Sequence, residues 1–147
     1  MELSAAQSFR GRDIPECVFS EFTLPDDWIG RQAAGTLWVG EIDGGVEAFL
    51  GATAHGDRLH IDEFAVARDH QGKGLGRLML DRMIAQARAS GFRRLSLTTF
   101  RSVPFNGPFY ASVGFRMWDR LPAEIEAALA GEAARGLNDR CAMVMEL

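Results

Sequence analysis

The chain has 147 residues, of which 47% are hydrophobic, and a formal net charge of -4. This size and apolar content predict one domain, residues 1–147, that buries its own core. Charges of mixed sign argue against a nucleic-acid partner. Because no apolar run reaches about eighteen residues and the start lacks a signal-peptide pattern, we expect no membrane partner and a cytoplasmic location.

The N-terminal part predicts helix followed by a β-hairpin. Residues 13–34 favour helix in pieces, interrupted at Pro15 and Pro25, because a proline inside a helix removes a backbone donor. Two runs rich in β-forming residues follow. They are joined by residues 43–45, whose Asp-Gly-Gly sequence is typical of an antiparallel hairpin turn. The predicted strands of this part are residues 36–42, 46–54 and 59–66.

An amphipathic helix is predicted from residue 75 to the glycine at position 91. Apolar residues recur there at helical spacing, with charged residues on the other side, and a glycine commonly follows a helix end. The apolar positions are Leu75, Leu78, Met79, Met83 and Ala87.

The C-terminal part alternates short strands and short helices. The predicted strands are residues 94–100, 115–118 and 141–147, and the predicted helices are residues 109–113 and 122–134. Strands that come before and after one crossover helix predict an α/β (α+β) fold. We expect a mixed, mostly antiparallel central sheet with helices on both faces.

The most informative motif is a glycine-rich turn between the strand 59–66 and the long helix. Gly72, Gly74 and Gly76 carry no Cβ that would keep an anion off the backbone, and the N–H groups at a helix start are unpaired and partly positive. Such a turn binds phosphate, although the same spacing also occurs in plain flexible loops. A nucleotide-type phosphate loop does not fit, because Lys73 is followed by glycine instead of Ser or Thr, and a Rossmann turn does not fit either.

Residues 71–76 resemble the Arg/Gln-x-x-Gly-x-Gly/Ala signature of the GNAT superfamily of N-acetyltransferases. A second motif, Tyr110 followed after three residues by Gly114-Phe115, is similar to the end of that family's domain. The predicted order of elements over residues 36–118 is also similar. The resemblance, to small bacterial-type single-domain members, implies the acyl-CoA N-acyltransferase fold. It also implies acetyl transfer from acetyl-CoA, as co-substrate, to a primary amine of a small molecule or peptide by direct attack in a ternary complex.

The resemblance implies two sets of contacts with acetyl-CoA. The backbone of Phe64, Ala65 and Val66 would pair with the pantetheine arm, as an added strand does, while the strand 94–100 splays away. The side chains of Phe64 and Val66 are interpreted as core. The turn would hold the phosphates through main-chain N–H groups, and Asn106 is a candidate for one more contact. The implied turn residues are Gln71, Gly72, Lys73, Gly74, Leu75, Gly76 and Arg77, and of these Lys73 can equally be a solvated surface lysine.

Acyl transfer to an amine calls for a base near the nucleophile and an acid near the sulfur. Tyr110, the one tyrosine of the chain, occupies the family's acid position, with a buried structural ring as the alternative. Glu63 and His60 both remain candidates for the base, and Asp62 or water could replace them. Strand alternation puts His60 and Asp62 on one face of the sheet and Glu63 on the other, unless a bulge intervenes.

Other functions and contacts also follow from the sequence. A non-catalytic acyl-CoA-binding or sensing module would keep the phosphate turn without the acid and base, and a homodimer through the last strands is compatible with either function. We expect no metal, because Cys17 and Cys141 lack ligand spacing and are interpreted as reduced thiols. The residues expected to wall an acceptor pocket are Trp28, Trp38, Phe100, Phe105 and Phe109.

Overall fold

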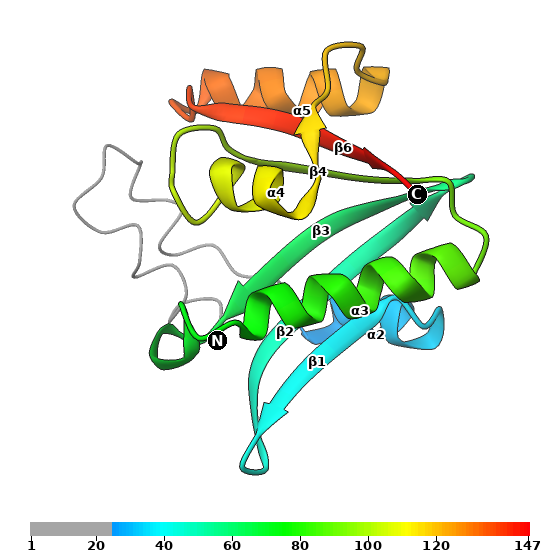
Figure 1. The fold of residues 1–147 in the computed structure, drawn as a ribbon. Helices are drawn as coiled ribbons and strands as arrows, with labels where there is room; N and C mark the ends of the chain where they lie inside the picture. The colour runs from blue at the N-terminus through cyan, green and yellow to red at the C-terminus, as the bar shows by residue number, and fades with distance from the viewer. Residues whose placement is uncertain (1–24) are drawn as a thin grey trace.

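A mixed six-stranded sheet carries the fold in the computed structural model, which describes residues 25–147 (Figure 1). The strands are β1 (Leu37–Ile42), β2 (Gly45–His55), β3 (Arg58–Val66), β4 (Arg94–Phe100), β5 (Arg116–Met117) and β6 (Arg140–Glu146). The helices are α2 (Pro25–Ala33), η3 (a 3-10 turn, Arg68–His70), α3 (Leu75–Ala89), α4 (Gly107–Val113) and α5 (Ala123–Ala134).

The strand order confirms the predicted sheet. It runs β1-β2-β3-β4-β6-β5, and β3 with β4 is the one parallel pair among the described strands. The two parallel strands are joined by the crossover helix α3, as parallel neighbours require. The predicted mixed, mostly antiparallel sheet is therefore confirmed.

The local turn and helix-start signals also correspond to the structure. The β1–β2 hairpin turns on Asp43 and Gly44, both with positive φ (51° and 82°), as the tight hairpin turn requires. Pro25 begins α2 and does not interrupt it, since a proline is tolerated in the first turn of a helix. The rest of the predicted helical segment, with Pro15, lies outside the described residues.

Helices cover both faces of the sheet. Leu97 of β4 belongs to the core cluster that includes α3 and Tyr110 of α4. The next residue, Thr98, accepts a hydrogen bond from Arg140, which in turn pairs with Glu132 of α5. Because successive strand residues point to opposite faces, α3 and α4 lie on one face and α5 on the other. We call these the α3 face and the α5 face.

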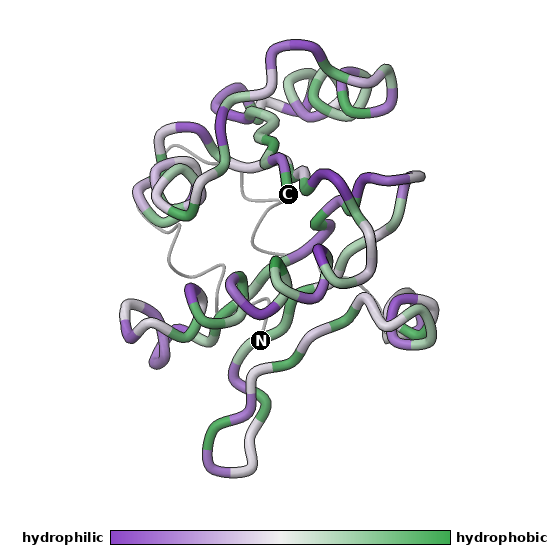
Figure 2. The backbone as a smooth tube through the Cα atoms, turned by 45° about the vertical axis from the view of Figure 1, so that its right-hand side comes forward, coloured by the Kyte–Doolittle hydropathy of each residue, from purple (hydrophilic) through white to green (hydrophobic). Residues whose placement is uncertain are grey.

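The helix α3 is amphipathic, but its buried stripe is rotated from the predicted one. Figure 2 shows hydrophobic and hydrophilic residues alternating around the helix. Leu78, predicted to be apolar core, is 54% exposed, because it lies about 140° around the helix from Met83 at the centre of the stripe. The buried residues are Met79, Leu80, Met83, Ile84 and Ala87.

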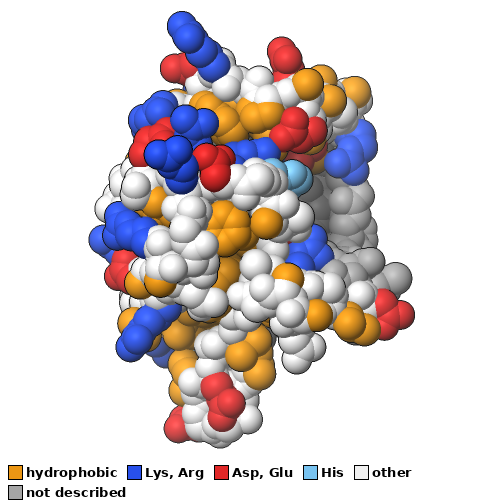
Figure 3. All heavy atoms as spheres, turned by 90° about the vertical axis from the view of Figure 1, so that its right-hand side faces the viewer, with side chains coloured by type: hydrophobic (Ala, Val, Ile, Leu, Met, Phe, Trp, Pro, Cys, Tyr) orange, Lys and Arg blue, Asp and Glu red, His pale blue; other side chains and the backbone are white. Residues whose placement is uncertain are grey.

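Charged side chains of both signs lie on the face of the molecule at the right of Figure 1. Figure 3 shows acidic and basic side chains beside one another on the face at the right of Figure 1. Among the ion pairs of the described residues, Glu146 contacts both Arg94 and Arg116. Acidic and basic side chains therefore lie close enough on that face to offset each other's charge. Between residues 25 and 147, no helix has both the length and the apolar character that a membrane crossing needs.

The packing of α2 on the sheet provides a test of the fold. The Trp28 ring lies over Gly51 of β2, where a Cβ would overlap it, and meets Phe49 edge to face at 5.2 Å. We expect Gly51→Ala to lower the free energy of unfolding by about 1–3 kcal/mol through overpacking. Gly131→Ala in α5, where a Cβ meets open space, should instead raise it by up to about 1 kcal/mol. Urea unfolding of both variants measures this, and equal stability of Gly51→Ala and the wild type would contradict the packing.

Candidate active site

The site begins where β3 and β4 separate. Their parallel pairing extends from Arg58 opposite Arg94 to Ile61 opposite Leu97. Both strands continue beyond that point, β3 to Val66 and β4 to Phe100, without pairing to each other. The expected splaying of the strand 94–100 is thus confirmed, and we call the region between the two unpaired strand ends the opening.

Backbone groups of β3 are directed into this opening. The Ala67 N–H donates to the Glu47 carbonyl of β2 at 2.8 Å. Since hydrogen-bonded and non-bonded pairs alternate along an antiparallel ladder, the N–H and C=O groups of Phe64 and Val66 point away from β2. The Gln71 side chain donates to the Val66 carbonyl at 2.9 Å. Gln71 therefore ties the turn to the strand end and leaves the Val66 N–H directed into the opening.

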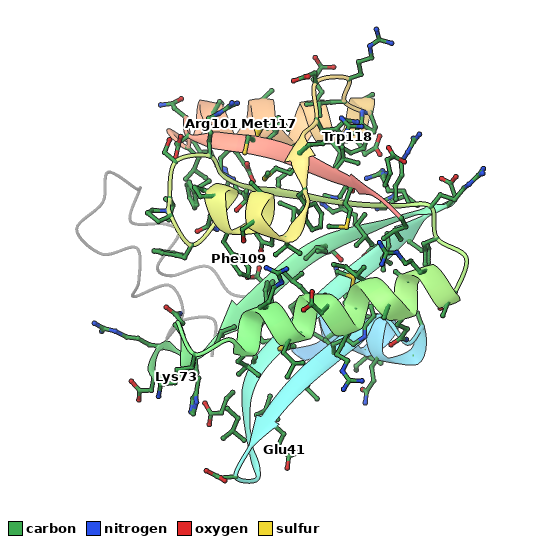
Figure 4. All side chains as sticks on the ribbon, viewed as in Figure 1. Glu41, Lys73, Arg101, Phe109, Met117 and Trp118 are labelled. Atoms are coloured by element: carbon green, nitrogen blue, oxygen red, sulfur yellow. The ribbon has the colours of Figure 1, made fainter. Side chains whose placement is uncertain are left out.

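The glycine turn that follows leaves room for a ligand against its backbone. Gly72 and Gly74 have φ angles of 70° and 88°, which side chains rarely adopt, and a Cβ on either would meet open space. Gly76 differs, because its Cβ would contact Phe64 and Phe109 at 3.5 and 3.8 Å. Figure 4 shows Phe109 reaching from α4 toward the start of α3. The first two glycines thus open the turn, and the third packs it against the core.

The start of α3 has the character of an anion site. No side chain caps this end of the helix. Its first backbone N–H groups therefore have no side-chain partner and carry partial positive charge at the turn. Lys73 extends outward from the turn (Figure 4). Arg77 reaches toward α4, where it donates to the Ser112 carbonyl at 3.5 Å. Among residues 25–147, no three His, Cys, Asp or Glu side chains are grouped so that they could hold a metal.

A buried acceptor lies at the other side of the opening. Asn106 precedes α4, and its side-chain nitrogen donates to Thr99 of β4 at 2.8 Å. Its Oδ1 atom is the one buried side-chain polar atom of the described residues that lacks a hydrogen-bond partner. Because buried polar groups are almost always paired, this oxygen fits a donor group on a bound ligand.

Tyr110 of α4 is buried beside the opening. It is 8% exposed, and its ring packs between those of Phe109 and Phe115, with centroids 5.4 and 5.8 Å away. Burial raises the pKa of Tyr110, and the Glu63 carboxylate raises it further. The structure therefore brings Glu63 within electrostatic reach of the phenol, whose proton stays on at neutral pH. No described residue hydrogen-bonds the hydroxyl.

A β-bulge in β3 determines which way these residues point. The β2–β3 ladder pairs Gly51 with Glu63 and Ala52 with Ile61, so Asp62 is one residue too many on β3. A bulge of this kind bends the strand and shifts its alternation by one residue. The simple alternation that separates Glu63 from His60 is therefore wrong.

Glu63 and His60 instead lie on the same face, the α5 face. Directly opposite residues of paired strands share a face, and Thr53 is opposite His60. Asp62 lies there as well, because its Oδ2 atom accepts hydrogen bonds from Thr53 at 2.6 Å and from Arg31 of α2 at 2.8 Å. The carboxylate of Asp62 is thus engaged in holding the bulge.

His60 is held in a polar network between β3 and β4. Its Nδ1 atom lies 2.8 Å from the Oγ atom of Ser96, which is fully buried. Burial lowers the pKa of His60 from 6.5 to about 4, so the ring is neutral at pH 7. The charged neighbours act in opposite directions: Asp62 and Glu124 raise this pKa, whereas Arg58 and His55 lower it.

The aromatic residues expected to wall an acceptor pocket do not all lie on one face of the sheet. Trp28 lies over Gly51 on the side of α2, whereas Trp38 donates to Gln86 of α3 at 2.9 Å, on the opposite face. The expectation that both tryptophans line one pocket is therefore wrong. Phe100 is buried under the Arg140 guanidinium, 4.8 Å from its ring centroid.

Some members of this site were missed in the sequence. Ser96 and Arg58 were not singled out, although a serine in the middle of the apolar run Leu95-Ser96-Leu97 is a signal for a buried hydrogen bond. Cys141 is a buried free thiol, as expected, and Cys17 lies outside the described residues.

The sequence of this chain is similar to that of known proteins. The sequence model described as "Acetyltransferase (GNAT) family" matches residues 4–115. The mouse protein N-alpha-acetyltransferase 80 is 41% identical over 59 residues, which are 40% of this chain and 18% of that protein.

Among the solved structures with a similar fold are two that contain coenzyme A. The PaiA N-acetyltransferase of Thermoplasma acidophilum in complex with coenzyme A has a TM-score of 0.73, at 14% identity over 99% of this chain and 88% of that one. N-acetylglutamate synthase of Neisseria gonorrhoeae, complexed with coenzyme A and N-acetyl-glutamate, has a TM-score of 0.67 at 22% identity over 86% of this chain. This chain spans 28% of that synthase. It therefore covers less than a third of the length of the synthase, as it does of the mouse relative.

The burial of His60 predicts a pH dependence of stability. Between pH 6.5 and about 4 the unfolded chain binds a proton that the folded chain does not, so the free energy of unfolding falls as the pH falls through this window. We expect His60 to account for a loss of about 3 kcal/mol at most. Urea unfolding of the wild type and of His60→Gln from pH 8 to pH 4 measures it. The variant should lose less stability, and parallel curves would contradict the burial of a neutral ring.

Proposed function

The chain belongs to the acetyltransferase (GNAT) family, and we propose that it transfers the acetyl group of acetyl-CoA to a primary amine by direct attack in a ternary complex. One observation carries this proposal. Glu63, on β3 just beyond its pairing with β4, acts electrostatically on the buried phenol of Tyr110, so a proton acceptor on the α5 face and a proton donor on the α3 face flank the opening. An acid and a base on the two sides of a reacting carbonyl are what acyl transfer to an amine uses.

The residues around the opening fit coenzyme A. The open backbone of Gly72 and Gly74 and the uncapped start of α3 suit its phosphates. The backbone N–H and C=O groups of Phe64 and Val66 that point away from β2 suit the amides of its pantetheine arm, which would continue the sheet as an added strand. The orphaned Oδ1 atom of Asn106 can accept from one more N–H or O–H group of the ligand. The structural relatives named above that contain coenzyme A support this assignment.

The proposed reaction assigns a proton to each group. The amine nitrogen attacks the thioester carbonyl carbon, whose oxygen gains charge near the Val66 N–H. The C–S bond then breaks, and the sulfur receives a proton from the Tyr110 hydroxyl. The proton that the amine loses goes to Glu63, directly or through one water, and from Glu63 to solvent, which returns a proton to Tyr110. Because the pKa of Tyr110 is raised, its hydroxyl carries the proton at neutral pH.

The acceptor is proposed to be a small-molecule or peptide amine. It would approach on the α5 face, where the bulge directs Glu63. The complex of the gonococcal relative contains N-acetyl-glutamate, a product with an amine-derived amide, which supports this class. A panel of small amines and short peptides with acetyl-CoA, read by release of free thiol, tests the activity. Binding of acetyl-CoA without release to any acceptor would favour the alternative, an acyl-CoA-binding module.

The phosphate turn can be tested with two glycines of similar conformation. Gly74 and Gly44 have φ angles of 88° and 82°, and a Cβ on either meets open space. Asp at both positions should cost similar stability. Gly74→Asp should in addition weaken acetyl-CoA binding on the order of 100-fold, because a carboxylate would lie against the phosphates. Calorimetric titration measures this, with Gly44→Asp as the matched control in the distant hairpin. Equal affinities would rule out the turn as the phosphate site.

The acid and base can be tested by substitutions that keep shape. Tyr110→Phe should reduce turnover roughly 10²- to 10⁴-fold, with little change in acetyl-CoA affinity, because it removes one proton donor. Glu63→Gln should also reduce turnover, with partial recovery at high pH, where the amine loses its proton unaided. Glu146→Gln, at the end of β6, serves as the exposed-carboxylate control. Near wild-type turnover of Tyr110→Phe would remove the phenol from the mechanism.

A further inference from the structure

His60, one of the two residues considered for the base, belongs to a hydrogen-bonded chain that determines where its proton sits. Four residues form this chain across the α5 face, from the start of α5 to the edge of the opening. In order they are Glu124, Arg58, Ser96 and His60. The chain runs between side chains of β3 and β4 within the last paired stretch of these strands.

The outer end of the chain fixes the direction of its hydrogen bonds. The guanidinium of Arg58 donates to the Glu124 carboxylate at 2.7 Å and to the Ser96 hydroxyl at 2.8 Å. It is 9% exposed and lies 5.4 Å from the ring centroid of Trp118, which Figure 4 shows beside α5. A guanidinium has donors and no acceptor, so the Ser96 oxygen must accept from Arg58.

The hydroxyl proton of Ser96 then needs an acceptor of its own. Among the described residues, the other polar contact of this fully buried hydroxyl is the Nδ1 atom of His60, at 2.8 Å. If Nδ1 carried a proton, both Arg58 and His60 would donate to the Ser96 oxygen. The hydroxyl proton of Ser96 would then be left unpaired in the interior, which is unfavourable. Nδ1 is therefore the acceptor, and the one proton of the neutral ring is on Nε2.

We propose that Arg58 and Ser96 hold His60 as the Nε2–H tautomer, so that His60 donates a hydrogen bond to an oxygen of the acceptor substrate and Glu63 alone takes the amine proton. This inference rests on the proposed acetyl transfer. A ring with its Nδ1 occupied by Ser96 and its Nε2 already protonated has no nitrogen left to act as a base. Ser96 and Arg58 are positioning residues, because they act on the substrate through His60.

The tautomer can be read without any turnover. Nitrogen-15 NMR of the histidine rings at pH 7 separates protonated from unprotonated ring nitrogens, and the His60 signals are those that disappear in His60→Gln. We expect an unprotonated Nδ1 and a protonated Nε2. A protonated Nδ1 would overturn the proposal. Ser96→Ala should increase the share of the other tautomer, and Ser96→Thr, which keeps the hydroxyl, should not. Because the wild-type spectrum decides the tautomer by itself, the conclusion stands even if Ser96→Ala fails to fold.

Two variants of His60 distinguish a donor from a base. The amide nitrogen of Gln reaches the place of Nε2 and can donate there, whereas Asn reaches only as far as Nδ1. We expect His60→Asn to raise the KM for the amine by up to about 10-fold relative to His60→Gln, the effect of one hydrogen bond. In both variants kcat/KM should still fall toward acidic pH as Glu63 gains a proton, a fall that Glu63→Gln abolishes. Absence of this fall in both His60 variants would make His60 the base and overturn the proposal.

The proposed function and this inference fail in different measurements. If no amine is acetylated, the proposed function fails, whereas the ring spectrum still decides whether Ser96 sets the tautomer. If turnover depends on Tyr110 but the spectrum shows a protonated Nδ1, acetyl transfer stands and the role assigned to His60 is wrong.

Discussion

The end of the pairing between β3 and β4 is the constraint on which the rest of the site depends. After Ile61 and Leu97 the two strands separate, and the bulge at Asp62 bends β3 at that point. Each strand keeps its other neighbour, β2 or β6, so the separation costs only the hydrogen bonds on one side of a few residues. Those are the backbone groups that a ligand can pair with.

The two faces of the sheet divide the chemistry. On the α3 face, apolar packing holds Tyr110 among aromatic rings and turns the start of α3 toward the strand end. On the α5 face, polar side chains cross between strands and helices and hold their neighbours by hydrogen bonds. Asp62 is bound by Arg31 and Thr53, and this contact stabilises the bulge that directs Glu63. A ligand phosphate and an acceptor amine would thus meet different environments on the two sides of one opening.

Local sequence signals determined much of the scaffold. The Asp-Gly turn of the hairpin, the apolar period of α3 and the glycines before it depend on backbone preferences within a few residues. For the same reason the sequence located the candidate turn 71–76 and the motif around Tyr110. Leu78 shows the limit of periodicity: the pattern predicts a helix, but the neighbouring strands decide which stripe of it is buried.

Tertiary contacts decided the orientation of the site residues. Nothing near Asp62 in the sequence indicates a bulge, since the extra residue is defined only by the register with β2. The hydrogen-bond partner of His60 is Ser96, which lies 36 residues away in the chain. Trp28 and Trp38 lie on opposite faces although they are ten positions apart in the chain. The sequence by itself therefore determined which residues could carry the chemistry, because motifs and turns are local. Only the tertiary structure decided which of them face one another, because strand register and buried hydrogen bonds join segments that are distant in the chain.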